Sequence, residues 1–344
     1  MSEQNAVAPQ CWSKLLCLAQ SANDGSGDKS SQLMSTEDRK FVESAMAEAV
    51  QLTDPVKHMT KYIEQLKLMK DPSKDDVNII AEIVENLEDL VCDIDLAADF
   101  CKLGGLVEVI RILKSDCDSV RCEVARLISL LAQNNPYVQN IMLETDLLPY
   151  LLTVLEEIEA SEDLVSRTLS GLSAIVRAHE KAFNQFRKLN GLEKIVDVFQ
   201  QSINNNNLKI ANKAVLITTS IATSLGPDVK RYNVLSILFR MALQLSPDSV
   251  GCSYFFDYLM NNIVDKERDD NDLTNGDEFK ISYMELDIEC KQQFHEFLER
   301  HLEHEEQPSN ELQNFLTRIR KKVNMVPSKE TRNLKLGEGL SSNL

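Results

Sequence analysis

Histidine and tryptophan are scarce in this chain of 344 residues, which contains five histidines and one tryptophan. The nucleotide-binding patterns GxxxxGK[ST] and GxGxxG are absent, and so is the GxSxG turn of many serine hydrolases. His301 and His304 lie one helical turn apart. Because the HxxH spacing lacks the glutamate and the outside ligand of a zinc protease, we interpret this pair as part of a solvated helix face. The sequence therefore predicts no enzyme, no cofactor and no metal site.

Long apolar runs and an excess of basic charge are missing as well. No apolar stretch reaches the length of a membrane span, and no secretion signal is recognisable, so we expect no membrane association. The 54 acidic and 37 basic residues give a formal charge of −17, which would repel nucleic acid. The eight cysteines are scattered without a CxxC pair. This pattern indicates reduced thiols in the cytosol, with the nucleus as a second compartment.

What the sequence does contain is an eight-residue apolar pattern that recurs. It starts at Leu106, Leu148, Leu192 and, more weakly, Leu235. The starts are 42, 44 and 43 residues apart (148−106, 192−148, 235−192). Self-similarity at about 40–47 residues with helical apolar spacing is typical of armadillo and HEAT repeats. Such a unit cannot bury its apolar face alone, so its copies stack into a superhelix.

Each repeat is predicted to hold three helices. Long segments with an apolar stripe lie at about 77–92, 119–134, 162–179 and 207–224, and each is followed by a short helix and then by the octapeptide helix. Three helices per unit favour the armadillo type over the two-helix HEAT type. We therefore predict an all-α, right-handed superhelical armadillo solenoid with helical caps, present as a monomer.

The composition outside the repeats changes along the chain, which suggests further segments. A polar, glycine-containing stretch comes first, and highly charged or polar stretches interrupt and end the C-terminal part. The predicted order is a flexible segment at 1–35 with an apolar island, a helical pair at 36–75, about four repeats at 76–249, a helical cap at 250–323 with an acidic loop at 265–278, and a disordered tail at 324–344.

The third helix of an armadillo unit lines the concave groove, so its residues decide what the groove binds. Import receptors carry a ladder of tryptophan and asparagine there. Alignment of the units places Arg126 and Leu130, then Gly171 and Ile175, at the two positions of that ladder. The predicted groove therefore lacks the side chains that hold an extended basic peptide.

The groove instead offers charges of both signs. Glu88 lies on the first long helix, Arg126 on the second and Lys213 on the fourth. A folded domain with complementary charges would suit this surface. For each single residue, contact with a partner and a solvated surface role both stay open, because binding energy concentrates in few positions.

Several stretches resemble a known family, the armadillo-type nucleotide exchange factors for cytosolic 70-kDa heat-shock chaperones. Residues 88–105 resemble the first repeat of that family. They read Glu-Asp-Leu-Val-Cys-Asp-Ile-Asp-Leu-Ala-Ala-Asp-Phe-Cys-Lys-Leu-Gly-Gly. Residues 132–135, 175–179 and 186–192 add to the resemblance, and residues 36–68 resemble the leading helical pair of the family.

The resemblance implies a function that is not enzymatic. In this family the solenoid embraces one lobe of the chaperone's nucleotide-binding domain and displaces the other, so that ADP leaves and ATP can enter. By position, the resemblance implies that the partner-binding residues are Asp93, Asp95, Ala97, Gln133, Asn134, Arg177, His179, Lys209 and Lys213. From the groove charges alone we add Glu88 and Arg126.

Members of the family also carry a flexible N-terminal segment that occupies the chaperone's substrate groove and frees misfolded clients. The apolar residues Leu15, Leu16 and Leu18 fit that role, and the alternative is a tail helix that docks on the solenoid. For the whole chain, the alternative to an exchange factor is an armadillo scaffold, such as a ubiquitin-ligase or cytoskeletal adaptor.

Overall fold

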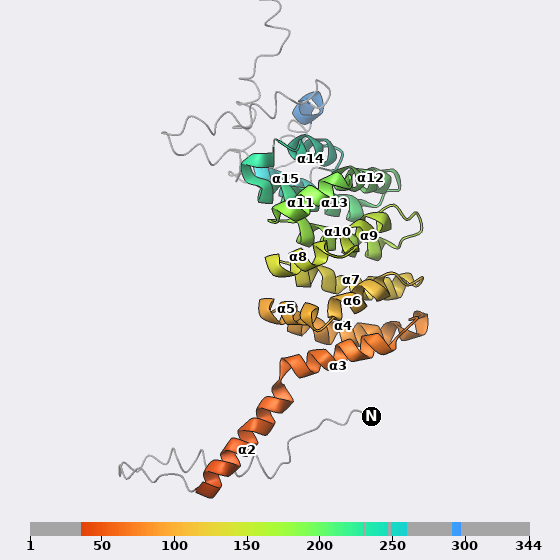
Figure 1. Cartoon of the computed structure of the whole chain (residues 1–344). Coiled ribbons are helices and arrows are strands. Elements are labelled where there is room, and N and C mark those ends of the chain that lie inside the picture. The colour runs from red at the N-terminus through yellow and green to blue at the C-terminus, as the bar shows by residue number, and fades with distance from the viewer. Residues whose placement is uncertain (1–35, 230, 247–248, 260–290, 297–344) are drawn as a thin grey trace, which may run out of the picture. The chain divides into compact units, whose positions relative to one another are not determined.

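The computed structural model of the chain describes residues 36–229, 231–246, 249–259 and 291–296 (Figure 1). Throughout these ranges the regular elements are helices, which confirms the predicted all-α class. The chain divides into two compact units, residues 1–65 and 66–344. The predicted apolar island, the acidic loop at 265–278, the tail at 324–344 and the histidine pair at 301 and 304 lie outside the described residues.

Two helices lead into the repeats: α2 (Thr36–Thr53) and α3 (Pro55–Leu68). They meet at Asp54, whose carboxylate accepts a hydrogen bond of 3.0 Å from the backbone nitrogen of Val56. Proline at the first position of α3 loses no helical hydrogen bond, because the first amide groups of a helix have no partner within it. The predicted restart of the helix at this point is confirmed.

The second unit repeats a short helix, an octapeptide helix and a long helix. The three complete repeats are α5–α7, α8–α10 and α11–α13, preceded by the long helix α4 and followed by α14 and α15. The bounds are η1 (Lys74–Asp76), α4 (Val77–Val91), α5 (Ile94–Lys102), α6 (Gly105–Leu113), α7 (Asp118–Ala132), α8 (Pro136–Leu143), α9 (Leu147–Val154), α10 (Glu162–Val176), α11 (Glu180–Lys188), α12 (Gly191–Asn204), α13 (Leu208–Leu225), η2 (Gly226–Val229), α14 (Val234–Ala242) and α15 (Val250–Leu259).

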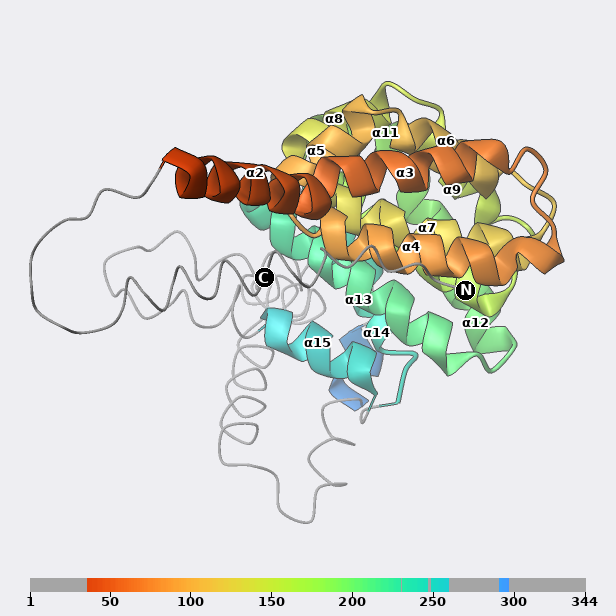
Figure 2. The same ribbon diagram turned by 90° about the horizontal axis from the view of Figure 1, so that it is seen from below.

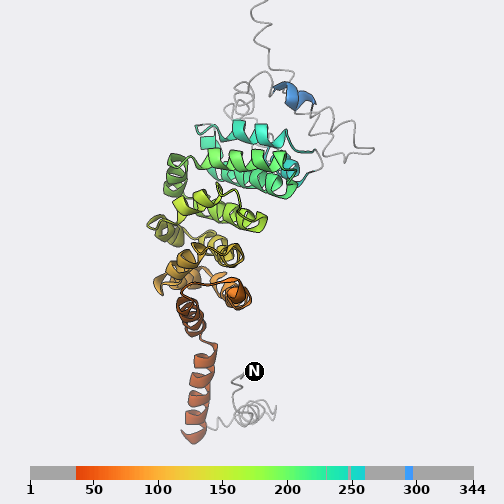
Figure 3. The ribbon, with the colours of Figure 1, turned by 90° about the vertical axis from the view of Figure 1, so that its right-hand side faces the viewer.

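The long helices form one continuous layer of the second unit. Helix α4 packs on α7, α7 on α10, α10 on α13, and α13 on α15. In Figure 2, which looks along the stack, α4 and α13 lie toward one side, and α5, α8 and α11 lie toward the other. Figure 3 shows the repeats of this unit as successive layers. The helices and their order are those of an armadillo solenoid, as predicted.

The octapeptides supply much of the core between the layers. Their first residues, Leu106, Leu148, Leu192 and Leu235, are each at most 4% exposed. Each octapeptide therefore removes one face of its helix from water, at about 25 cal/mol for each Å² of apolar surface. The octapeptide pattern recurs in the sequence because each repeat buries the same helix face.

The long helices end earlier than the apolar spacing predicts. Helix α7 ends at Ala132 and α10 at Val176, whereas the predicted ends were 134 and 179. Gln133 and Arg177 adopt extended backbone, and the next residues, Asn134 and Ala178, have positive φ values of 53° and 55°. This turn stops the helix although the local composition would allow it to continue.

The turn into the octapeptide helix depends on a glycine that faces an aromatic ring. A Cβ atom on Gly191 would lie 2.2 Å from the ring of Phe186, and one on Gly105 would lie 2.4 Å from the ring of Phe100. The middle repeat has Leu147 at the corresponding place and a methionine in place of the phenylalanine. Glycine is thus required where the short helix ends on a phenylalanine.

We expect the Gly191→Ala variant to lose about 1–3 kcal/mol of unfolding free energy, the usual cost of overpacking a core. The added methyl group would force the ring of Phe186 out of a site in which it is 0% exposed. Urea unfolding followed by circular dichroism measures the loss. The double variant Gly191→Ala/Phe186→Met, which copies the middle repeat, should recover part of it. An unchanged midpoint for the single variant would contradict the clash.

Candidate functional site

The long helices carry half-exposed polar side chains on the side that faces away from the octapeptide core. We call the surface formed by Glu88 of α4, Arg126 of α7, Arg167 and Ser170 of α10 and Lys213 of α13 the long-helix face. Four of these five residues, all except Lys213, line one hollow, together with Ala125, Ser129 and Leu130. The hollow spans α4, α7 and α10, so it exists only when consecutive repeats are stacked.

Arg126 is held between two carboxylates. Its Nε donates to Glu88 Oε1 at 2.8 Å, its second terminal nitrogen pairs with the other oxygen of Glu88, and the first donates to Glu123 at 2.9 Å. The paired oxygens of a carboxylate match the fork of a guanidinium, which makes such pairs stronger than single contacts. Glu88 and Arg126, both predicted to bind a partner, therefore neutralise each other and tie α4 to α7.

The predicted ladder position on α10 is wrong by one residue. Ile175 is 0% exposed and Gly171 is also buried, so neither side chain reaches the surface. The α10 residue that takes the place of Arg126 in the hollow is Ser170, 44 residues further along the chain (170−126), and Arg167 of the same helix lines the hollow beside it. The predicted ladder residue Gly171 lies 45 residues after Arg126, and its burial shows that a spacing of 45 points into the core.

Four of the predicted residues lie at the corners that follow the long helices. Gln133 and Arg177 are the C-caps of α7 and α10, and Asn134 takes the left-handed conformation of the first corner. His179 is the N-cap of α11, and its Nδ1 accepts a hydrogen bond of 3.1 Å from the backbone nitrogen of Ala182. These residues shape the corner between consecutive helices, a role that the sequence analysis did not foresee.

Asp93, Asp95 and Ala97 belong to helix α5 and differ in what they can contact. Asp93 is the N-cap, and its Oδ1 accepts hydrogen bonds from the backbone nitrogens of Asp95 and Leu96 at 2.9 and 3.0 Å. Asp95 is exposed. Ala97 is 1% exposed, so the prediction that it contacts a partner is corrected: its side chain belongs to the core.

The two predicted lysines of α13 have different surroundings. Lys209 is exposed and pairs with Glu162 at 2.9 Å and with Asp163 at 3.2 Å. Lys213 is half-buried, and its Nζ donates to the hydroxyl of Ser166 at 2.7 Å. Arg167 and Ser170 were not predicted. The repeat period points to Arg167, because it follows Glu123 by 44 residues (167−123) and Glu123 borders the same face.

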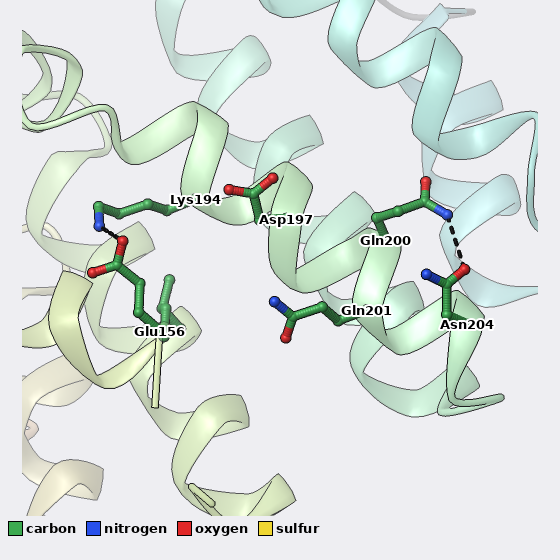
Figure 4. Close-up of a pocket in the computed structure, with 7 residues that line it drawn as sticks. Glu156, Lys194, Asp197, Gln200, Gln201 and Asn204 are labelled. Carbon is green, nitrogen blue, oxygen red and sulfur yellow. Dashed lines mark hydrogen bonds and ion pairs between the residues drawn. The ribbon is translucent and has the colours of Figure 1, made fainter. Parts of the chain in front are cut away.

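A second hollow lies between the octapeptide helices α9 and α12 and is shown in Figure 4. Lys194 pairs there with Glu156, and Gln200 donates to Asn204 at 3.2 Å. Its lining holds carboxylates, amides and the Lys194 amine, and Lys194 is already paired with Glu156. Within the described ranges, no three histidine, cysteine or acidic residues gather into a possible metal site. No helix in these ranges has the length and apolar content to cross a membrane.

Comparison with known proteins connects this geometry to a family. Residues 96–220 match the family model described as the SIL1/FES1/HPBP1 C-terminal domain. These 125 of the 344 residues (220−96+1) are thus similar to that domain. The match runs from the first turn of α5 into α13, and therefore covers the three complete repeats and most of the long-helix face.

Individual relatives agree with the family model. Hsp70-binding protein 1 of Homo sapiens is 28% identical over 205 residues, which cover 57% of this chain and 57% of the relative. The Macaca fascicularis protein of that name is 27% identical over 215 residues, covering 60% and 59%. The Hsp70 nucleotide exchange factor FES1 of Eremothecium gossypii is 26% identical over 184 residues, covering 52% and 62%. The chain thus spans about three-fifths of the length of the curated relatives that it matches.

Two solved structures resemble the fold. A designed armadillo repeat protein in complex with the peptide (KR)4 has a TM-score of 0.52 at 14% identity, covering 77% of this chain and 99% of that chain. An engineered protein has a TM-score of 0.51 at 16% identity, covering 77% and 98%. At these identities the similarity establishes the armadillo architecture and nothing about the ligand.

The cap formed by His179 predicts a pH dependence of stability. Burial lowers the pKa of His179 below 6.5, and the charge of Lys181 lowers it further. Because folding favours the neutral ring, this contribution is complete above the unfolded pKa of about 6.5. It is lost as the pH falls from there through the folded pKa.

We expect His179→Asn to flatten the dependence of the urea midpoint on pH between about 7.5 and 5, because asparagine caps in either condition. Asn135, the N-cap of α8 one repeat earlier, is an example of such a cap: its side-chain oxygen accepts a hydrogen bond from the backbone nitrogen of Val138. In the control variant His179→Ala the urea midpoint should also vary little with pH. This variant should be less stable by about 1 kcal/mol at neutral pH, because alanine cannot cap the helix. If the urea midpoint of His179→Asn depended on pH as steeply as that of the wild type, the imidazole of His179 would not be the source of the pH dependence.

Proposed function

We propose that this protein is a co-chaperone that binds the nucleotide-binding domain of a cytosolic 70-kDa heat-shock chaperone, accelerates ADP release and so promotes client release. The observation that carries the proposal is the overlap of the family match with the repeats that form the long-helix face. Relatives named for Hsp70 binding and for nucleotide exchange support the partner and the activity. On this proposal the protein is not an enzyme and acts as a monomer.

The physical mechanism is differential binding to two states of the chaperone. A protein that binds the opened nucleotide-binding domain better than the closed one must weaken nucleotide binding by the same factor. A tenfold weakening of ADP binding requires a preference of about 1.4 kcal/mol for the opened form. A stiff surface can supply this preference because it does not adapt to the closed form.

The stiffness comes from polar contacts that link one repeat to the next. The phenol of Tyr150 in α9 donates to the backbone oxygen of Leu113 in the preceding repeat at 2.8 Å. Within one repeat, Gln139 of α8 donates to the backbone oxygen of Ala174 in α10 at 2.8 Å. Arg126 connects α4 and α7, as described above. Because these contacts require defined distances between layers, they resist changes in curvature.

The five cysteines that the structure describes are free thiols, which supports a reducing compartment. We therefore propose the cytosol as the site of action, with the nucleus as a second compartment. Among the predicted contacts, we retain Asp95, Gln133, Asn134 and Lys209 as exposed candidates for direct contact with the chaperone.

The decisive experiment is stopped-flow release of a fluorescent ADP analogue from a cytosolic 70-kDa chaperone in the presence of the full chain. We expect acceleration, and we expect the variant Asp93→Asn/Asp95→Lys to reduce it. Asparagine keeps the cap of α5, so the loss would report the reversed charge at Asp95 and not an unfolded helix. The single variant Asp93→Asn is the matched control and should behave like the wild type.

Binding of the chaperone without faster ADP release would contradict an exchange function and favour the scaffold interpretation. Absence of binding would leave only the fold established. Either result is obtained with the same wild-type protein, before any variant is made.

The N-terminal segment allows a separate prediction. If residues 1–35 occupy the substrate groove, as Leu15, Leu16 and Leu18 suggest, their deletion should leave ADP release unchanged and slow the release of a bound model peptide. Fluorescence anisotropy of a labelled peptide on the chaperone measures this step. Unchanged peptide release after deletion would exclude the role of the segment.

A further inference from the structure

Two cations of the long-helix face lie on neighbouring helices without a carboxylate between them. Arg167 on α10 and Lys213 on α13 are 46 residues apart (213−167), which is about one repeat, and both are half-exposed. Within the described part of the chain, neither forms an ion pair. Lys213 donates to the hydroxyl of Ser166. The charge of Arg167 acts on the Cys122 thiol and opposes the rise in its pKa that burial causes. Their charges are therefore not neutralised by these contacts.

The other cations nearby are neutralised. Arg126 has Glu88 and Glu123, and Lys209, one turn before Lys213, has Glu162 and Asp163. The cations on both sides of the pair thus have ion-pair partners. Asp163, whose charge also acts on Lys213, is itself paired with Lys209.

The opposite end of the face carries the opposite charge. Glu82, Glu85 and Asp89 of α4 are exposed, and no ion pair joins them to another described residue. The face is consequently acidic at α4, neutral at α7 and basic at α10 and α13. A surface with this polarity distinguishes between two orientations of a charged partner.

The cation pair has an energetic cost in the free protein. Burial lowers the pKa of Lys213, the charges of Arg167 and Lys209 lower it further, and the charge of Asp163 opposes this shift only in part. Two like charges that water screens incompletely destabilise each other until an anion arrives. The hollow beside Arg167, which is lined by Ser129, Leu130 and Ser170, provides room for an incoming side chain.

We propose that Arg167 and Lys213 together bind a carboxylate side chain on the surface of the chaperone's nucleotide-binding domain. This inference rests on the proposed function and adds a specific contact to it. The carboxylate would sit between α10 and α13, accept hydrogen bonds from the guanidinium and the ammonium, and replace the missing acid of this part of the face. The acids of α4 then face a basic region of the same partner, which sets the orientation of binding.

The first test measures affinity for the chaperone with Arg167→Gln, Lys213→Met and the double variant of the full chain. Each single change should weaken binding about tenfold, the usual size of one hydrogen bond to a charged group. The dependence of affinity on salt should also become shallower, because fewer charges pair at the interface. Lys188→Gln, which removes an exposed lysine of α11 with the same change in net charge, should leave affinity and salt dependence unchanged.

The urea midpoint of each variant serves as the control for correct folding. Methionine keeps the aliphatic stem of Lys213 and removes a half-buried charge, so Lys213→Met should be at least as stable as the wild type. Wild-type affinity in a folded double variant would overturn the cation site and leave the exchange function intact. A wild type that neither binds the chaperone nor accelerates ADP release would overturn the proposed function itself.

A second test identifies the carboxylate directly. A carbodiimide activates a carboxylate, and an amine in contact with it then forms an amide while the oxygen leaves in the urea by-product. In the complex, Lys213 should become linked to an aspartate or glutamate of the nucleotide-binding domain, as mass spectrometry of the digested product can show. A link from Lys213 to an acid of this chain, such as those at 265–278, would overturn the proposal, because the cation pair would then have an internal partner.

Discussion

The structure depends on one constraint: the apolar face of each repeat is buried only when the next repeat covers it. The first leucine of every octapeptide is almost fully buried, and each long helix packs on the long helix of the following repeat. Polar contacts also join successive layers. Arg111 donates to the backbone oxygens of Leu66 and Lys70, 45 and 41 residues away, and Lys114 pairs with Asp146, 32 residues away. A solenoid of this kind is stabilised by contacts between neighbours.

The same constraint decides which side chains remain available for binding. Helix α10 is rich in small residues, and a Cβ atom on Gly171 would lie 3.0 Å from Ile128 of α7. The close approach of these helices buries the positions that a peptide-binding armadillo protein would use for its ladder. What reaches the surface between them is a serine, a leucine and the charged groups around the hollow. The chemistry of the face is thus a consequence of how tightly α7 and α10 pack.

Charge on the long-helix face serves two purposes. The cluster of Glu88, Arg126 and Glu123 joins two repeats and leaves no net positive charge at α7. Arg167 and Lys213 make no such pair within the described residues, and so their charges remain available to a partner. A charged residue in an armadillo groove is therefore informative only once its neighbours are known, because the same type of side chain can either join two repeats or bind a partner.

Much of the fold could be predicted from the sequence, because the helical period and the repeat period are both local patterns. The octapeptides located α6, α9, α12 and α14, and Pro55 located the start of α3. The turns after α7 and α10 could not be predicted, because the left-handed conformations of Asn134 and Ala178 arise from how one helix must reverse onto the next. For the same reason the sequence grouped Asp93 and His179 with the binding residues, whereas the structure uses both as helix caps.

The sequence by itself determined the all-α class, the repeat spacing and the acidic character of the chain, since each follows from residue type and spacing. Only the tertiary structure decided which charges are neutralised. The partner of Arg126 is 38 residues away in the chain and that of Lys209 is 46 or 47 residues away, and such pairs exist only after the repeats have stacked. The physical reason is that two charges interact strongly only when they lie a few ångströms apart in space. Separation along the chain does not give that distance, which is set only when the fold is complete.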